Sequence, residues 1–204
     1  MRRVAPRGFT LIELLVVMGI IGVLASLTVG LVSVASRSQN TKRAESDLNE
    51  LVTLIENYKS DTGSYPPDNP GKPGLSPLFY ELSGTTFDAG LYSVAGVEEK
   101  LGLGFVNDIF NPNGFGNTAR SPGELKSKHN FKPNQHKKFT EQGAPVQLLT
   151  SPQRGPSTTS RPAADGTPAN VWQYVRTNPQ HNRSSFDLWI DISIGTSVVQ
   201  IHNW

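Results

Sequence analysis

The feature that most constrains this chain is a long run without an ionisable side chain, from Leu14 to Ser36. As an α-helix rising 1.5 Å per residue, such a run is long enough to cross the roughly 30 Å hydrocarbon core of a bilayer. Basic residues lie on both sides of it, so charge counting orients it only weakly. As a leader, the short N-terminus would stay in the cytoplasm, and residues after about 37 would lie outside.

A single carboxylate, Glu13, lies at the front end of this apolar run. An ordinary secretory signal peptide is the alternative interpretation, but its apolar core is only about 7 to 15 residues long and is followed by a small-residue cleavage site. Placing a carboxylate at membrane depth costs roughly 2.5 to 3.5 kcal/mol on insertion scales. Glu13 is therefore expected to have a partner or a purpose.

The residues around Glu13 resemble a known family. GFTLIELLVV, residues 8–17, is similar to the cleavage and methylation motif of type IV prepilins and type II secretion pseudopilins. The resemblance implies that a membrane aspartyl peptidase cuts after Gly8 and methylates the new amine of Phe9. It also implies that Glu13 pairs with the N-terminal ammonium of a neighbouring subunit. Within one helix these groups lie roughly 6 Å apart by the rise per residue, which favours a staggered neighbour as the partner.

Gly30 is a departure, because the resembled family often has proline at this place. Glycine weakens a helix but keeps its amide hydrogen, so local melting of the helix is one interpretation. Close packing of small residues against neighbouring helices is the other, and the sequence does not separate the two.

Beyond the apolar run, spacings of three and four residues describe one face of an amphipathic helix that continues to about Lys59. The apolar residues of this face are Ala44, Leu48, Leu51, Val52, Ile55 and Tyr58. The helix should end near Gly63, because Pro66 and Pro67 forbid its continuation. YKSDTGSYPPD, residues 58–68, resembles the end of the long helix in the major pseudopilin of type II secretion. A short second helix is expected at residues 75–82.

Residues 84–170 show no repeat and are rich in glycine, asparagine and proline, which predicts a loop-rich insertion. Between residues 120 and 138 basic side chains outnumber the single acid, and Phe131 and Phe139 are candidate stacking groups for a polyanion. A solvated loop explains such a run better, so nucleic acid is not an expected partner. Residues 151–168 are predicted to be an exposed irregular linker.

The C-terminal residues return to a strand pattern and predict a small antiparallel sheet from Val171–Val175, Phe186–Ile194 and Ser197–Ile201. They also resemble the C-terminal strands of the major pseudopilin, in which an acidic, glycine-rich loop carries calcium. This chain has ISIGTSVV in place of that loop. Asp187 and Asp191 supply too few oxygen ligands for an ion that wants six to eight, so no metal is predicted.

Composition excludes several other kinds of chemistry. The chain has no cysteine, hence no disulfide and no thiolate metal site. Within the resembled family this absence favours secretion pseudopilins over structural pilins. The net charge of +2 falls to −1 without residues 1–8, since 19 − 3 = 16 basic residues then face 17 acidic ones. The four histidines lack metal-ligand spacing, and there is no nucleophile elbow, so neither an enzyme nor a cofactor is expected.

Together these features predict a pilin-like α+β fold. A long N-terminal helix, membrane-spanning in its first half, packs on a small C-terminal antiparallel sheet with a loop-rich insertion. The expected divisions are a leader (1–8), a transmembrane and assembly helix (9–36), an amphipathic continuation of the stem (37–62) and a periplasmic head (63–204).

The function implied by the resemblance is that of a structural subunit of a type II secretion pseudopilus, polymerising through its helix in the inner membrane to support protein export. Its partners would be further copies in a helical filament, the prepilin peptidase, the assembly platform with other pseudopilins, and inner-membrane lipid. Two alternatives stay open. One is a type IV pilin for adhesion, motility or DNA uptake, and the other is a signal-anchored binding protein that never polymerises.

Overall fold

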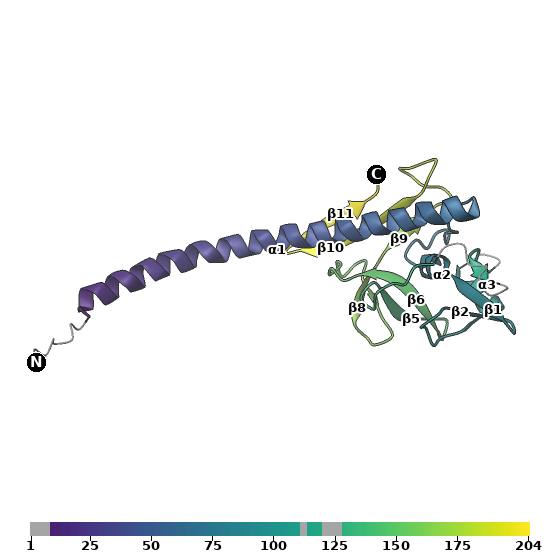
Figure 1. Ribbon diagram of the computed structural model, residues 1–204, viewed down its shortest axis with the longest axis horizontal. Coiled ribbons are helices and arrows are strands. Elements are labelled where there is room, and N and C mark those ends of the chain that lie inside the picture. Colours follow the sequence, from purple (N-terminus) through teal and green to yellow (C-terminus); the bar gives the residue numbers. More distant parts are fainter. Residues whose placement is uncertain (1–8, 111–113, 120–127) are drawn as a thin grey trace, which may run out of the picture. The chain divides into compact units, whose positions relative to one another are not determined.

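A computed structural model describes residues 9–110, 114–119 and 128–204 of the chain, and within helix α1 the side chains of residues 27–36 also lie outside the described part (Figure 1). The chain divides into two compact units, Met1–Asn40 and Thr41–Trp204. Helix α1, Leu11–Thr62, contributes residues to both. Its backbone is helical at Gly30.

The second unit combines the end of α1 with two short helices and three sheets, which confirms the predicted α+β, pilin-like class (Figure 1). The short helices are α2 (Leu78–Ser83) and α3 (Leu103–Phe110). The first sheet has the order β3-β2-β1-β4, with β1 (Thr85–Asp88), β2 (Leu91–Ser93), β3 (Leu101–Gly102) and β4 (Thr118–Ala119). The second has the order β5-β6-β8-β7, with β5 (His136–Glu141), β6 (Ala144–Ser151), β7 (Arg161–Pro162) and β8 (Pro168–Val171). The third has the order β11-β10-β9, with β9 (Gln173–Val175), β10 (Asp187–Ile194) and β11 (Ser197–His202).

The third sheet is the C-terminal antiparallel sheet that the strand pattern predicts. β10 pairs with β11 over six residue pairs, from Trp189 opposite His202 to Ile194 opposite Ser197. On its other edge β10 pairs with β9. Buried and partly exposed residues alternate along β10, as expected for a strand with one face toward a core.

The predicted insertion, residues 84–170, holds more regular structure than its composition suggests. Most of its strands are only two to four residues long, which leaves little periodicity to detect in the sequence. The β5–β6 hairpin is longer, and its two-residue turn is formed by Gln142 and Gly143 at φ 47° and 83°. Two positive φ angles give the turn whose twist matches that of the flanking strands, and glycine adopts one of them without strain.

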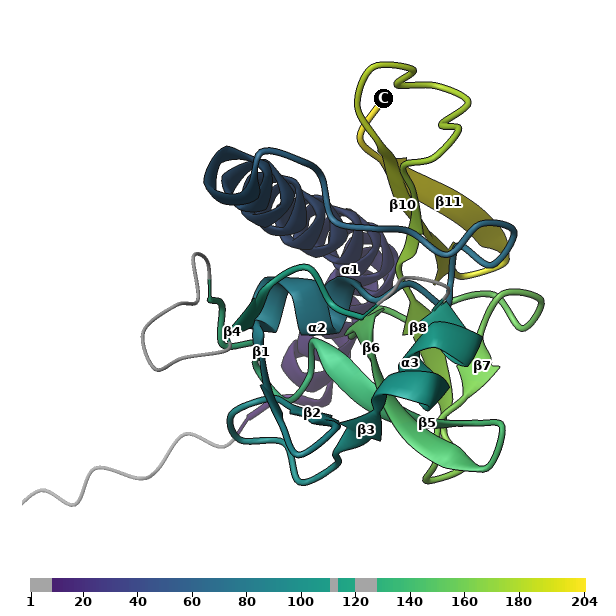
Figure 2. The ribbon, with the colours of Figure 1, turned by 90° about the vertical axis from the view of Figure 1, so that its right-hand side faces the viewer.

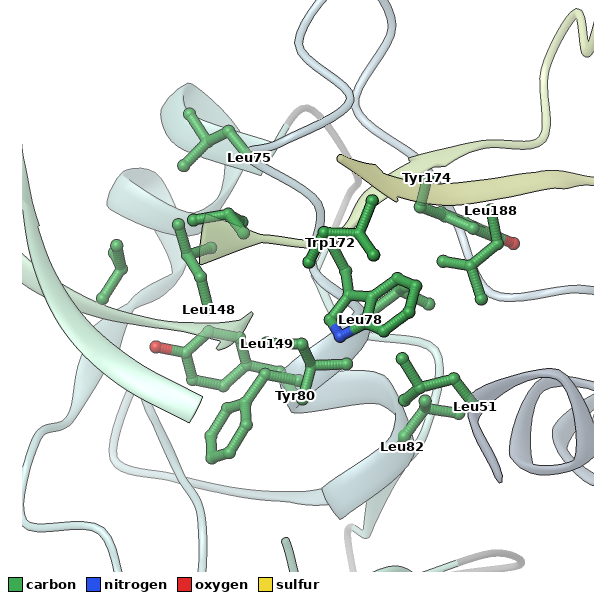
Figure 3. Packing of buried hydrophobic residues seen from close by; sticks show 14 of the residues in the cluster. Leu51, Leu75, Leu78, Tyr80, Leu82, Leu148, Leu149, Trp172, Tyr174 and Leu188 are labelled. Atoms are coloured by element: carbon green, nitrogen blue, oxygen red, sulfur yellow. The ribbon is translucent and has the colours of Figure 1, made fainter. Parts of the chain in front are cut away.

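The core of the second unit is built on the apolar stripe of α1. Ala44, Leu48, Leu51, Ile55 and Tyr58 are all buried, which confirms the face predicted from their spacing. Figure 3 shows Leu51 facing the indole of Trp172, the residue that joins β8 to β9, with Leu149 of β6 beside it. Helix α2 packs against β6 (Figure 2). Apolar burial of this kind stabilises by roughly 25 cal/mol per Å².

The turn after α1 is fixed by side chains and amides of the third sheet. The buried Tyr174 donates its hydroxyl hydrogen to the carbonyl oxygen of Pro66 at 2.8 Å. The carboxylate of Asp68 accepts the amides of Arg176 and Thr177, each at 2.9 Å. The proline pair that ends the helix is therefore also an anchor of the C-terminal strands.

A fully buried carboxylate, Glu81 of α2, lies where three segments meet. It accepts the hydroxyl of Tyr58 at 2.9 Å and the amides of Gly116 and Asn117 at 2.8 and 2.9 Å. Burial raises the pKa of Glu81, and these three hydrogen bonds oppose that rise. A side chain at residue 116 would come within 2.6 Å of the Tyr58 hydroxyl, so glycine is required for this close approach.

Replacing Tyr58 by Phe tests how much the hydrogen bond from Tyr58 to the buried Glu81 contributes to the stability of the fold. The variant keeps the ring but removes one hydrogen bond to a buried carboxyl group, so we expect the free energy of unfolding to fall by about 1–3 kcal/mol. Urea unfolding of the full chain in detergent, followed by fluorescence of the buried Trp172, measures it. Tyr65→Phe is the matched control, because its hydroxyl bonds lie nearer the surface. An equal loss in both variants would contradict the prediction.

Candidate functional site

The candidate site from the sequence is the start of α1. Gly8 lies outside the described residues. Phe9 precedes the helix and is 83% exposed. Glu13 lies in the first helical turn, two residues after the helix begins at Leu11. The predicted roles of the three residues in cleavage, methylation and assembly stay predictions.

Glu13 has a partner within its own chain that the sequence interpretation missed. Its Oε2 accepts the backbone amide of Thr10 at 2.9 Å and the Thr10 hydroxyl at 2.8 Å. The Thr10 hydroxyl oxygen in turn accepts the amide of Glu13 at 3.3 Å. This is a capping box, with Thr10 at the N-cap and Glu13 at the third helical position. The signal was present in the sequence as threonine followed three residues later by glutamate, directly before an apolar run.

The capping box satisfies helix-end amides that otherwise have no partner. It also places a negative charge at the positive end of the helix dipole, which is a favourable position. No hydrogen bond to the second oxygen of Glu13, Oε1, is found within the described residues. The carboxylate is therefore oriented by its own helix and keeps one oxygen open.

After this cap the helix is apolar on all sides as far as Leu24. Every large apolar side chain from Phe9 to Leu24 is exposed, with relative exposures between 46% and 85%. A helix that is hydrophobic all round is normally buried in a core, in lipid or against other helices. This surface is therefore incomplete without an apolar environment.

In the described part of the chain, no helix combines the length and the hydropathy needed to cross a membrane. Residues 27–36, which belong to the run predicted to span, have their side chains outside the described part.

In the described part of the basic run, residues 128–138, two of the basic side chains lie beside acidic residues. Lys138 is paired with Glu99 at 2.5 Å, and His129 lies 3.4 Å from Glu50. Phe139 is buried in the core and Phe131 packs against it, so neither ring is free to stack on a base.

Asp187, one of the two acids considered for calcium, organises a loop. Its carboxylate accepts the amides of Gln180, His181 and Asn182 at 2.7, 3.0 and 2.8 Å. Asp191 accepts a hydrogen bond from the Gln200 side chain. Among the described residues, no three His, Asp or Glu side chains lie close enough together to hold a metal ion.

Comparison with known proteins places the start of α1 in a defined class. Residues 5–29 match the family described as the prokaryotic N-terminal methylation motif. Type II secretion system core protein G of Escherichia coli (strain K12) is 42% identical over 69 residues, which cover 34% of this chain and 48% of that protein. The core protein G of Pseudomonas aeruginosa is 35% identical over 75 residues, covering 37% of this chain and 53% of that protein. The chain spans about half the length of the curated relatives it matches. No solved structure matches it.

The motif and the fold together define a type IV prepilin-like protein of α+β architecture. Over its N-terminal third the chain is distantly homologous to type II secretion system core protein G, the major pseudopilin. Pilin-like proteins are structural rather than enzymatic, and prepilin-like proteins are anchored in the inner membrane.

The carboxylate of Asp187 generates a prediction about pH. Burial raises its pKa, but the amides of Asn182, His181 and Gln180 outweigh this and leave the pKa below its ordinary value. The ionised group therefore stabilises the fold above the unfolded pKa of about 3.9, and this stabilisation is lost as the pH falls through the lower folded pKa.

We expect Asp187→Asn to be less stable than the wild type at pH 7 and to lose less stability on acidification. Urea unfolding of the full chain between neutral and acid pH measures both effects. Asp191→Asn, on the same strand, should be close to the wild type at pH 7. If the free energy of unfolding of Asp187→Asn fell with decreasing pH as it does in the wild type, the loop would not depend on this charge.

Proposed function

We propose that this protein is a structural subunit of a type II secretion pseudopilus, inserted in the inner membrane by the first part of α1 and assembled into a helical filament through it. The observation that carries the proposal is the exposed apolar surface of the helix from Phe9 to Leu24, whose first turn holds the oriented carboxylate of Glu13. The homology to core protein G covers the same part of the chain and supports this choice.

In this proposal each segment has a role that follows from its chemistry. Prepilin peptidase cuts after Gly8 and methylates the amine of Phe9, which then carries a positive charge. The open carboxylate oxygen of Glu13 in a neighbouring subunit forms an ion pair with this ammonium. The leader occupies residues 1–8, the membrane and assembly helix 9–36, the stem 37–62 and the periplasmic head 63–204.

The proposed partners follow from the methylation motif and the homology to core protein G. They are further copies of this chain, the peptidase, the inner-membrane assembly platform with other pseudopilins, and lipid around the apolar helix. A surface pilus that takes up DNA is a weaker candidate, because Lys138 and His129 lie beside acidic residues and the two phenylalanines are packed.

Two roles of Glu13, capping its own helix and pairing with a neighbour, can be separated by substitution. Glutamine at position 13 still completes a capping box but has no charge. We expect Glu13→Gln to be processed normally and to form few or no filaments, as expected also for Glu13→Ala. Thr10→Ala keeps the charge and removes the hydroxyl, so it should still assemble. Electrophoretic mobility measures processing by the peptidase, and the yield of sheared filaments measures assembly.

Normal filaments from Glu13→Gln, with failure of Thr10→Ala, would mean that capping and not charge pairing is the role of the carboxylate. Two cysteines in one chain, at Leu11 and Leu15, provide a control for assembly itself, since the chain has no other cysteine. In a filament the two positions of neighbouring subunits come together repeatedly, so an absence of crosslinked ladders from this two-cysteine chain would favour a monomeric anchored protein.

A further inference from the structure

A cavity of about 430 Å³, here called the β8 cavity, opens in the second unit beside β8. The end of β6, the loop after it and the start of β5 supply its other walls. Residues 151–168 were predicted to be an exposed linker, but Ser151, Gln153 and Gly155 are buried and line this cavity. The first part of this segment is therefore packed against the fold and forms one wall of the cavity.

The β8 cavity has two positive charges and no acidic residue in its lining. They belong to Arg154 and Lys137. The Arg154 guanidinium makes no hydrogen bond or ion pair within the described residues, and the Lys137 ammonium donates to the Thr167 hydroxyl at 2.8 Å. Asp165 is linked to Lys137 through Thr167, but it does not line the cavity. The net charge of the lining is positive.

Two buried side chains bring donors to the same cavity. Gln153 is 9% exposed and its Oε1 accepts the hydroxyl of Ser151, while for its Nε2 no partner is found among the described residues. Thr150 is 3% exposed, and its hydroxyl likewise has no partner in this part of the chain. Neither atom is among the enclosed side-chain atoms without a partner in the described residues, so both are open to solvent and can donate to an acceptor that enters the cavity.

A second, larger cavity of about 510 Å³ gives a useful contrast. Its lining includes the carboxylates of Glu141 and Asp191, and its Arg161 is already paired with Glu141. The charges there compensate one another. The β8 cavity lacks such compensation.

We propose that the β8 cavity is an oxyanion site, which takes a phosphate or carboxylate group carried by a hydroxylated small molecule such as an acidic sugar. A guanidinium matches both anions with two parallel hydrogen bonds, and the ammonium adds a second charge. The hydroxyls of Ser157 and Ser160 and the amide of Asn134, which also line the cavity, can meet the hydroxyl groups of the ligand. The site does not depend on filament formation.

Calorimetric titration of the full-length protein in nonionic detergent tests the site, with glucose 6-phosphate, inorganic phosphate and glucose as probes. We expect the two phosphates to bind and glucose not to bind. Arg154→Gln and Lys137→Gln should each weaken binding at least about tenfold, because each removes a hydrogen bond to a charged group. Arg183→Gln is the matched control, because it changes the net charge equally but Arg183 does not line the cavity.

Arg154 and Arg183 are both exposed, so neither substitution threatens folding. Ser157→Glu adds a carboxylate to the lining and should abolish phosphate binding. No binding of either phosphate, binding of glucose as tight as that of glucose 6-phosphate, or unchanged affinity in Arg154→Gln would overturn the proposal. Tighter binding of the sugar phosphate than of inorganic phosphate identifies a hydroxylated ligand, and equal binding identifies the free anion; both outcomes support an oxyanion site.

Discussion

The second unit depends on the burial of one face of α1. Five side chains of this face are at most 6% exposed and Val52 is partly buried, and the face meets Trp172 and Leu149; the five are Ala44, Leu48, Leu51, Ile55 and Tyr58. Because the stripe repeats every three or four residues, it is covered only if a length of helix lies along the strands. The helix is therefore the surface on which the sheets of this unit are organised.

Buried carboxylates fix loops in a chain that has no cysteine. Three buried carboxyl groups each accept at least two backbone amide hydrogens: those of Asp68, Glu81 and Asp187. The amides belong to a segment far along the chain for Asp68 and Glu81, and to the preceding loop for Asp187. Each such charged hydrogen bond contributes about 1.5–3 kcal/mol, so several together compare with the roughly 2–5 kcal/mol of a native disulfide. For Asp187, whose amide partners hold its pKa below the ordinary value, this ties the loop structure to acid stability.

Local signals in the sequence predicted the elements that have a strong period or a clear stop. The stripe on α1, the end of the helix before Pro66, and the strands around Phe186–Ile194 were all predictable for this reason. The helix predicted at residues 75–82 begins later, at Leu78, because Pro77 occupies its N-cap. The first four-stranded sheet escaped prediction because its strands are only two to four residues long and because β1 also pairs with β4 far along the chain, with Thr85 opposite Thr118. The β8 cavity escaped it as well, since polar residues from β5, β6 and β8 converge only in the fold.

The capping box changes how the carboxylate at the front of the apolar helix should be understood. A charge there was expected to need a cation, but the amide of Thr10 and the positive helix end already offset part of its cost. That offset is only partial, because the helix end carries about half an elementary charge. A neighbouring ammonium would therefore meet a carboxylate that is already oriented and still negative, at its open oxygen. Capping and pairing are compatible, and the first lowers the entropy cost of the second by fixing the side chain before assembly.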